Sequence, residues 1–563
     1  MPRFLVALLF SCCLCLSGAA AFLQAKPRER SIRGISSRRR FSSVLAGQRQ
    51  GTSLAPPQKV AIVGGGPAGL LLAHYILDKT DNSVAVSIFE RGPDPRKDDS
   101  ISGRQYSLGL NVRGRAAISG IEDLWKAVAK EGLESDNFLL HVFGRKFRLR
   151  SQKADVPPSL LIGRKALCKA LATELVRKYG QRGGRLDLSF DSAPSSVDLG
   201  NGVLYLSKGK FAVADLIVGA DGMNSIVREA IVEAVEKQEK KTEATGEEEP
   251  DTEQRVREAM RFSSKETGKV LSEFRRETST LSGRWRVLHD NMPTSLDADA
   301  VHLLTGTLGQ GREKEGKKKT PVSGGLFVIP ARDGTCSVLV NWRESNPPVE
   351  LLSSTPSEFC DIIETGFKAF GRPSEEAAKR VLSQRNQFAQ VVYCSSMMAP
   401  QAVGTAVLIG DAAHATGGSQ GQGANSAALD CMAFGELLDK FRAEGLHGSG
   451  KGLDFQRLAS EFSARQTKEG HALLQLLQVE SLPFPWSILF FFREAFRSVI
   501  SKVPVLGKAV FGRDAALWGS SKQLKMSQSL VPYSEIAESY RFWIRRALER
   551  RGSQAPSGLK QTL

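Results

Sequence analysis

The sequence predicts an α/β protein, in which a parallel-sheet domain is interrupted by a β-rich domain and followed by a helical C-terminal region. Three observations carry this prediction. Residues 60–90 have the order strand, glycine turn, helix, strand, which is the repeating unit of a parallel sheet. A second strand-turn-helix pattern occurs far along the chain, at residues 406–441. Short apolar segments with strand-like alternation lie between the two, at residues 285–342.

A turn of three glycines follows the first predicted strand, Val60–Val63. Their spacing is G-x-G-x-x-G. The first glycine permits a tight turn, the second lets a pyrophosphate approach the backbone, and the third lets the following helix pack on the sheet. The N-terminus of that helix, residues 70–77, faces the phosphate. We predict a dinucleotide site here, because the alternative, a glycine turn without a ligand, explains none of the surrounding pattern. The turn residues are Gly64, Gly66, Pro67, Ala68 and Gly69.

Three further motifs extend this site. Glu90 ends the second strand, residues 84–89, where an acid accepts hydrogen bonds from a ribose. Asp221 and Asp411 also follow predicted strands and carry a carboxylate. A glycine-rich turn at 421–425 then begins a helix, and the N-terminus of that helix can hold a developing anion. Because these motifs lie on both sides of the β-rich segment, they predict one long, two-ended cofactor, FAD. The later motif residues are Asp221, Gly222, Gly410, Asp411, Gly423, Ala424 and Asn425.

Composition shifts along the chain predict its organisation. We expect a targeting leader, a first part of the Rossmann-like FAD-binding domain with a strand excursion, a charged insertion, a substrate domain, a second FAD-binding part and a helical region. Within these parts we expect one helix at 113–129, one strand at 138–149 and a long hairpin loop at 312–319. The six parts are the leader 1–56, the first FAD-binding part 57–230 with the excursion 136–150, the charged insertion 231–257, the substrate domain 258–385, the second FAD-binding part 386–445 and the helical region 446–563.

The net charge of +17 does not predict nucleic-acid binding. Residues 1–59 contain ten Lys or Arg and a single acid, Glu29, so they contribute +9 of this charge. The rest of the chain has no aromatic and basic residues interleaved as in a nucleic-acid platform. The eight cysteines have no C-x-x-C or metal-ligand spacing. We therefore expect reduced core thiols and no metal site.

The leader has two parts. Residues 4–22 are apolar and end in small residues, as in a signal peptide, and the segment to about residue 55 is rich in Arg and Ser, as in a transit peptide. The combination resembles the bipartite leaders of proteins of complex plastids and predicts a plastid location; a mitochondrial presequence and plain secretion are the alternatives. The apolar segment 482–492 is short for a membrane span, and we expect a core or lid helix, with peripheral membrane contact as the alternative.

The ordered motifs at 64–69, 221–222 and 410–411 resemble those of the group A FAD-dependent aromatic hydroxylases, which are p-hydroxybenzoate hydroxylase-like flavoproteins. Within this group the chain is most similar to the kynurenine 3-monooxygenase family. The similar segments are 103–115, 391–397, 410–415, 431–441 and 531–534. Two features depart from the family pattern: Gly418 stands where the flavin loop usually has proline, and a C-terminal membrane anchor is not evident.

The resemblance implies a role for each motif. The glycine turn would hold the pyrophosphate and Glu90 the adenosine ribose. Asp411 would hold the ribityl or phosphate end, and the turn at 423–425 would contact the isoalloxazine. Asp221 and Gly222 belong to a motif linked to both FAD and NAD(P)H. Arg91 would lie beside the adenine end, and Arg104, Gly109 and Arg164 near the flavin phosphates or ring; for Arg104 and Arg164 a surface salt bridge is an equal alternative. We expect His414 to be a packed histidine.

The implied activity is that of an FAD-dependent monooxygenase that consumes NAD(P)H and O2. It would hydroxylate a small aromatic or otherwise electron-rich substrate through a C4a-hydroperoxyflavin. Because the flavin performs this chemistry, no catalytic side chain is predicted. Two other functions stay open: an FAD-dependent reductase of an isoprenoid-type substrate, and a non-catalytic FAD-binding protein, which the glycine at 418 makes conceivable.

Overall fold

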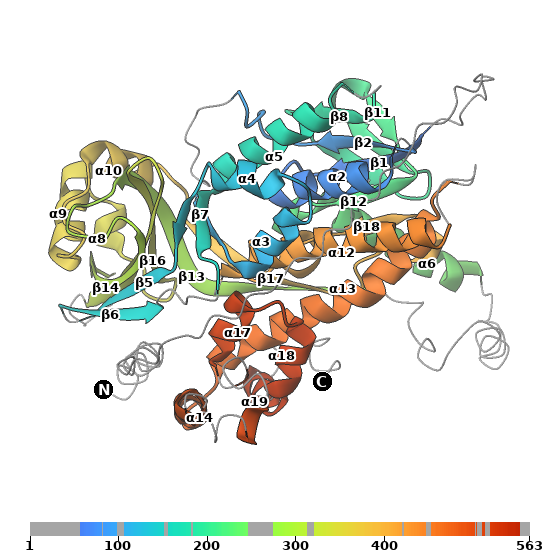
Figure 1. Ribbon diagram of the computed structural model, residues 1–563. Helices are drawn as coiled ribbons and strands as arrows, with labels where there is room; N and C mark the ends of the chain where they lie inside the picture. Colours follow the sequence, from blue (N-terminus) through green and yellow to red (C-terminus); the bar gives the residue numbers. More distant parts are fainter. Residues whose placement is uncertain are drawn as a thin grey trace, which may run out of the picture.

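The computed structural model describes most of the chain beyond the leader (Figure 1). The leader 1–56, Arg104, the loop 312–319 and the second half of the charged insertion lie outside the described residues. The described ranges are 57–81, 83–97, 106–142, 144–150, 156–181, 184–245, 274–311, 320–418, 421–445, 452–500, 503, 509–512, 518 and 520–551. Within them the fold is the predicted one: a parallel-sheet domain, a β-rich domain and a helical C-terminal region.

A parallel sheet of five strands forms the first domain, in the order β18-β12-β1-β2-β8. Every neighbouring pair runs parallel. Its apolar strands, such as Val60 to Val63, are buried in the largest hydrophobic core. Helix α2 packs between α5 and α12 beside this sheet. The elements are β1 (Gln58–Val63), α2 (Pro67–Lys79), β2 (Val84–Phe89), α5 (Arg164–Tyr179), β8 (Leu186–Ser189), β12 (Leu216–Gly219), α6 (Ile226–Thr245), β18 (Ala406–Leu408), α11 (Asp411–His414) and α12 (Gly423–Ala443).

A seven-stranded sheet forms the second domain, in the order β17-β13-β16-β15-β14-β5-β6. Its strands pair antiparallel except for β14 with β5. A separate core, which includes Leu326 and Phe359, lies between this sheet and helices α8 to α10. The elements are β5 (Asn137–Val142), β6 (Arg145–Arg150), β13 (Arg276–Asn291), β14 (Ala300–Gln310), β15 (Pro321–Pro330), β16 (Thr335–Arg343), α8 (Val349–Leu352), α9 (Pro356–Gly366), α10 (Glu375–Leu382) and β17 (Gln387–Cys394).

Two predicted elements are wrong in detail. The strand expected at 138–149 is a hairpin of β5 and β6, because Gly144 adopts a φ of 71° that permits a tight turn. The helix expected at 113–129 is two helices, α3 (Val112–Ser119) and α4 (Leu124–Ala129). Helix α3 ends at Gly120, and Asp123 adopts a left-handed φ of 60° before α4 begins.

Two small sheets and the C-terminal helices complete the structure. One small sheet, β3-β7-β4, lies between the two domains, and the other is β11-β10-β9. The C-terminal helices share a third core with β17. The five cysteines in the described residues are free and buried, as predicted. The remaining elements are β3 (Ser107–Leu110), β4 (Leu133–Ser135), β7 (Ser159–Gly163), β9 (Pro194–Asp198), β10 (Val203–Leu206), β11 (Phe211–Val213), α13 (Phe455–Gln478), α14 (Trp486–Ile500), α17 (Lys522–Gln528), α18 (Tyr533–Ser539) and α19 (Arg541–Arg551).

Candidate functional site

The predicted motif residues gather at one edge of the parallel sheet. Gly64 follows β1, Glu90 follows β2, Asp221 follows β12 and Asp411 follows β18, with a short turn at most between strand and residue. Because these four strands are parallel neighbours, their carboxyl ends meet at the same edge. In open α/β sheets, ligands bind outside the carboxyl ends of the strands. The topology therefore forms one candidate site from segments that lie far apart in the sequence.

The glycine turn leaves no room for side chains at two positions. Gly64 has a φ of 110°, and a Cβ atom there would lie 2.4 Å from the carbonyl oxygen of Ala220. A Cβ atom on Gly69 would lie 2.0 Å from the carbonyl oxygen of Gly64. These distances are far below contact, so the close packing of α2 on the sheet depends on glycine at both positions.

The N-terminus of α2 has the features of an anion site. Gly66 is its N-cap residue and Pro67 follows in the first turn, and no side chain caps this end. The first N–H groups of a helix have no partner within it and attract negative charge. Arg164 begins α5, and its Nη2 atom would lie 3.3 Å from a Cβ atom on Gly66. A guanidinium and a helix N-terminus therefore face the same space, as a pyrophosphate requires.

Glu90 joins the glycine turn after β1 to the loop after β2. Its Oε2 accepts a hydrogen bond from the Gly65 N–H at 2.7 Å, and its Oε1 accepts one from Gly92 at 2.8 Å. Each carboxylate oxygen has a second lone pair, so both can still accept a hydrogen bond from a sugar hydroxyl. Arg91, the next residue, is exposed beside it.

Asp221 has one carboxylate oxygen bound and one without a partner. Its Oδ2 accepts a hydrogen bond from the Ile226 N–H at 2.7 Å, which caps the start of α6. Its Oδ1 is buried and has no hydrogen-bond partner in the protein. Burial raises the pKa of this carboxyl group, although hydrogen bonds from Ser225 and Ile226 oppose the shift. Gly222 follows with a φ of 79°. An unpartnered buried acceptor beside the glycine turn fits a ligand with hydroxyl or amide donors.

Asp411 faces the N-terminus of α12. The residue is exposed, and its Oδ1 would lie 3.5 Å from a Cβ atom on Gly423, the first residue of α12. Protein atoms surround the carboxylate closely enough that desolvation raises its pKa, while the charges of His414 and Arg164 oppose the shift. Gly410 turns the chain into this position with a φ of 61°. The carboxylate is thus placed to accept hydrogen bonds from a polyhydroxyl group.

Two buried residues, Asp430 and His414, stabilise the turn at Gly410. Asp430 of α12 accepts hydrogen bonds from the Gly410 N–H at 2.9 Å and from Gln466 Nε2 at 2.9 Å. His414 Nε2 lies 2.8 Å from the same carboxylate. Burial lowers the pKa of His414, but the charge and hydrogen bond of Asp430, together with the charge of Asp411, raise it above its usual value. His414 is therefore a buried partner of Asp430, in agreement with its expected structural role.

The side chain of Asn425 has its hydrogen-bond partners within the protein. Its side chain is buried and donates to the carbonyl oxygens of Gly109 and Gly421, both at 3.0 Å. Its Oδ1 accepts from the Asn111 N–H at 3.0 Å. The side chain thus ties β3 to the glycine-rich turn. No side chain caps the start of α12, so its first backbone N–H groups, including that of Ala424, have no partner within the helix.

The C-terminal region joins the same network through residues that were not predicted. Arg113 is buried and donates to the carbonyl oxygens of Met526, at 2.8 Å, and Val531. Its guanidinium stacks over the Tyr533 ring, 4.2 Å from the centroid. The Tyr533 hydroxyl donates to Gln422 Oε1 at 3.3 Å, next to the turn at 421–425. No local pattern marks these contacts, because the partners lie more than a hundred positions apart in the sequence.

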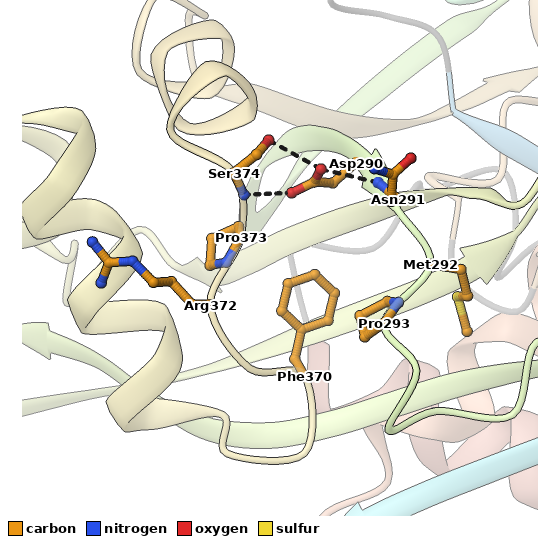
Figure 2. Close-up of a pocket in the computed structure, with 8 residues that line it drawn as sticks. All are labelled: Asp290, Asn291, Met292, Pro293, Phe370, Arg372, Pro373 and Ser374. Carbon is orange, nitrogen blue, oxygen red and sulfur yellow. Dashed lines mark hydrogen bonds between the residues drawn. The ribbon is translucent and has the colours of Figure 1, made fainter.

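One cavity, of about 350 Å³, lies away from this site (Figure 2). The second domain alone forms it, and it contains none of the predicted site residues. The Phe370 ring lies between Pro373 and Pro293, and Asp290 accepts hydrogen bonds from Ser374 N, at 2.6 Å, and Oγ, at 3.0 Å. The Asp290 carboxylate therefore already has hydrogen-bond donors within the protein. In the part of the chain that the structure describes, no His, Cys, Asp or Glu cluster could hold a metal ion.

Asp411→Ala is expected to remove FAD from the purified protein. The side chain is exposed and offers its oxygens to the candidate site, so its loss removes acceptors without opening the core. The measurement is the ratio of flavin absorbance to protein absorbance after purification. Asp439→Ala, which removes an exposed carboxylate from the far end of α12, is the matched control and keeps the full ratio. Stoichiometric FAD in Asp411→Ala contradicts the placement of this residue in the site.

The comparisons with known proteins give distant relatives and no matching family model. The chain is 26% identical over 434 residues to a protein named kynurenine 3-monooxygenase from Anopheles gambiae, covering 75% of this chain and 73% of that protein. It is 27% identical over 406 residues to violacein synthase from Chromobacterium violaceum, covering 69% and 79%. The structure of PqsL, described as a probable FAD-dependent monooxygenase from Pseudomonas aeruginosa, covers 77% of this chain and 99% of its own, with 16% identity and a TM-score of 0.49. With these sequence relatives, the chain is an enzyme of the oxidoreductase class.

Proposed function

We propose that the chain is an FAD-dependent monooxygenase that consumes NAD(P)H and O2 and hydroxylates a small aromatic or other electron-rich substrate. One observation carries the proposal. Four groups from four parallel strands converge on one sheet edge, and the last of them follows the first in sequence only after the whole second domain. A cofactor with a phosphate end and a distant ring end fits such a divided site. The names of the sequence relatives support the substrate class.

The residues present fit FAD in four places. The N-terminus of α2 and Arg164 would hold the pyrophosphate, and Glu90 would accept hydrogen bonds from the adenosine ribose. Asp411 would accept hydrogen bonds at the ribityl end. The positive end of α12 would stabilise negative charge on the ring. When bound, FAD supplies the redox chemistry that reduces and activates O2.

The protein's own contribution is to position this cofactor and to exclude water around its ring. Asn425 joins the turn at 421–425 to β3, and Gln422 joins it to Tyr533 of the C-terminal region. The side chains of Asn425, Gln422 and Tyr533 are all buried. A turn that is held from two sides keeps its N–H groups fixed, and fixed dipoles stabilise developing charge better than mobile ones. We therefore propose positioning roles for Asn425 and Gln422 rather than acid-base roles.

The test of the function is a product screen under labelled oxygen. The purified protein with FAD is given NADH or NADPH and a panel of aromatic acids and amines under ¹⁸O2, and products are measured by mass spectrometry. A monooxygenase places one ¹⁸O atom in the product for each NAD(P)H oxidised. A reduced product without ¹⁸O establishes the reductase instead. NAD(P)H consumption and product formation both absent across the panel, with FAD bound, establish a non-catalytic FAD-binding protein.

We further propose that residues 1–56 direct the protein to a plastid. The apolar segment followed by an Arg- and Ser-rich, acid-poor segment supports this location. A fluorescent protein fused behind residues 1–56 is expected to enter the plastid of a cell with complex plastids. Fluorescence in mitochondria or in the medium rejects the proposal in favour of the corresponding alternative.

A further inference from the structure

Helix α14 exposes an apolar stripe to solvent. Leu489, Phe492, Phe496 and Val499 follow one another at intervals of three and four residues, which places them on one face of a helix. Phe492, Phe496 and Val499 are 62%, 66% and 63% exposed. Such a row of large exposed apolar side chains is rare in soluble monomers and marks a contact surface. We call these four residues the α14 face.

The rest of α14 is packed firmly onto the C-terminal helices. Phe490 contacts Trp543 of α19 edge to face, with ring centroids 5.1 Å apart. The Arg493 guanidinium lies 4.9 Å from the centroid of the Tyr540 ring, and Glu494 accepts a hydrogen bond from the Tyr540 hydroxyl at 3.0 Å. The helix is thus held in one orientation, and the α14 face points outward from a rigid support. In Figure 1, α14 and α19 lie at the lower edge of the molecule.

Aromatic and basic side chains border the α14 face. Phe542 of α19 is 52% exposed and contacts Trp486, with ring centroids 5.7 Å apart. The Arg546 guanidinium lies 4.8 Å from the centroid of the Trp486 ring. Arg545 of the same helix is exposed. Trp and Phe beside Arg are typical of helices that lie at the boundary between lipid head groups and acyl chains.

Outside the leader, the net charge of the sequence lies in its C-terminal part, which contains α14 and α19. Residues 60–485 contain equal numbers of basic and acidic residues, 54 of each, and so have no net charge. Residues 486–563 contain 13 basic and 5 acidic residues, a net charge of +8. An anionic lipid surface complements this charge, worth about 1 kcal/mol for each Lys or Arg near the surface. A second copy of the chain would instead bring another +8 against it.

Helix α14 has 15 residues, which is short for a membrane span of about 20 residues. Among the described residues no helix is both long and apolar enough to cross a membrane. We propose that the α14 face lies on an anionic membrane surface, with its four apolar side chains and Phe542 in the lipid and the arginines of α19 at the head groups. This proposal is independent of the proposed function, since none of its residues belongs to the candidate cofactor site.

The experiment is vesicle co-sedimentation with the full chain and FAD. The vesicles are phosphatidylcholine alone or phosphatidylcholine with about 30% phosphatidylglycerol, an anionic lipid. We expect binding to the anionic vesicles, weakened when the NaCl concentration is raised because salt screens the charges. The double substitution Phe492→Ser and Phe496→Ser is expected to reduce the partition coefficient at least about tenfold, since two apolar side chains no longer leave water.

The matched control is Phe211→Ser, which removes a side chain that is also 66% exposed but lies on β11. Its partition coefficient is expected to equal that of the parent chain. Equal binding of the parent and of the double variant overturns the proposal, because any remaining affinity then comes from another segment. Concentration-dependent dimers in sedimentation velocity that the double variant abolishes, without vesicle binding by the parent, also overturn it in favour of a second copy. Thermal melts of all three chains verify that each is folded.

Discussion

Gly69→Ala is expected to abolish FAD binding and with it all activity. The added Cβ atom would lie 2.0 Å from the carbonyl oxygen of Gly64 and 3.1 Å from the Cγ2 atom of Ile62. The oxygen belongs to the backbone of the glycine turn, so it cannot move aside as a flexible side chain could. Helix α2 must shift away from β1, and its N-terminus then leaves the position at which it faces a pyrophosphate.

The expected change in stability is opposite in sign to the change that helix propensity predicts. Alanine stabilises a helix interior by about 1 kcal/mol relative to glycine, so propensity alone predicts a more stable protein. Overpacking a close contact costs about 1–3 kcal/mol. We expect a net loss of stability in thermal melts, together with a flavin-to-protein absorbance ratio near zero. Gly283→Ala is the control, because a Cβ atom at Gly283 in β13 meets nothing within 4 Å. A Gly69→Ala protein that keeps its flavin contradicts the close packing of this turn.

Asp430→Ala is expected to destabilise the protein by about 3–5 kcal/mol, since removing one partner of a buried ion pair leaves the other uncompensated. The Asp430 carboxylate is 4% exposed and is the hydrogen-bond partner of the Gly410 N–H, His414 and Gln466. In the variant, the Gly410 N–H, the His414 ring of α11 and the Gln466 side chain of α13 lose their hydrogen-bond partner inside the core. The measurement is the free energy of unfolding from urea titration, with and without added FAD.

The pH dependence of stability tests the pair of Asp430 and His414 with a smaller substitution, Asp430→Asn. The pKa of His414 is raised in the folded protein, so its protonated form stabilises the fold fully below its unfolded pKa of about 6.5. This contribution is lost as the pH rises through the raised folded pKa. The stability difference between the parent and Asp430→Asn is therefore expected to be largest at acidic pH and to shrink at alkaline pH. A difference that is constant with pH contradicts a charged His414 beside Asp430.

Residues that interact with near neighbours were predictable from the sequence. The bounds of β2, α5 and β8 follow from apolar periodicity, and the glycine turn follows from its spacing. The errors occur where one residue changes the chain direction. Gly144 converts one expected strand into a hairpin, and Gly120 with Asp123 divides one expected helix. In both places the flanking residues continue the same apolar pattern, so periodicity gives no signal for the break.

The candidate site likewise contains residues that were predictable from the sequence and residues that were not. Its motif residues were predictable because each follows a strand and carries its own chemistry. The buried partners that hold them were not. Asp430 lies within an ordinary helical pattern, and Arg113 is one arginine among many until the fold places Tyr533 under its guanidinium. For Asn425 the sequence predicts a contact with the ring of a cofactor, and only the fold shows that its side chain joins β3 to the turn at 421–425.

The sequence by itself therefore determined the α/β class, the glycine turn and the order of the carboxylates at the strand ends. Only the tertiary structure decided that β5 and β6 complete the sheet of the second domain, that the C-terminal region is attached to the turn before α12, and that α14 turns its apolar side outward. The physical reason is the range of the interactions. Strand and helix patterns reflect the residues next to one another, whereas pairing, burial and exposure depend on which distant segments meet, and local composition does not record that.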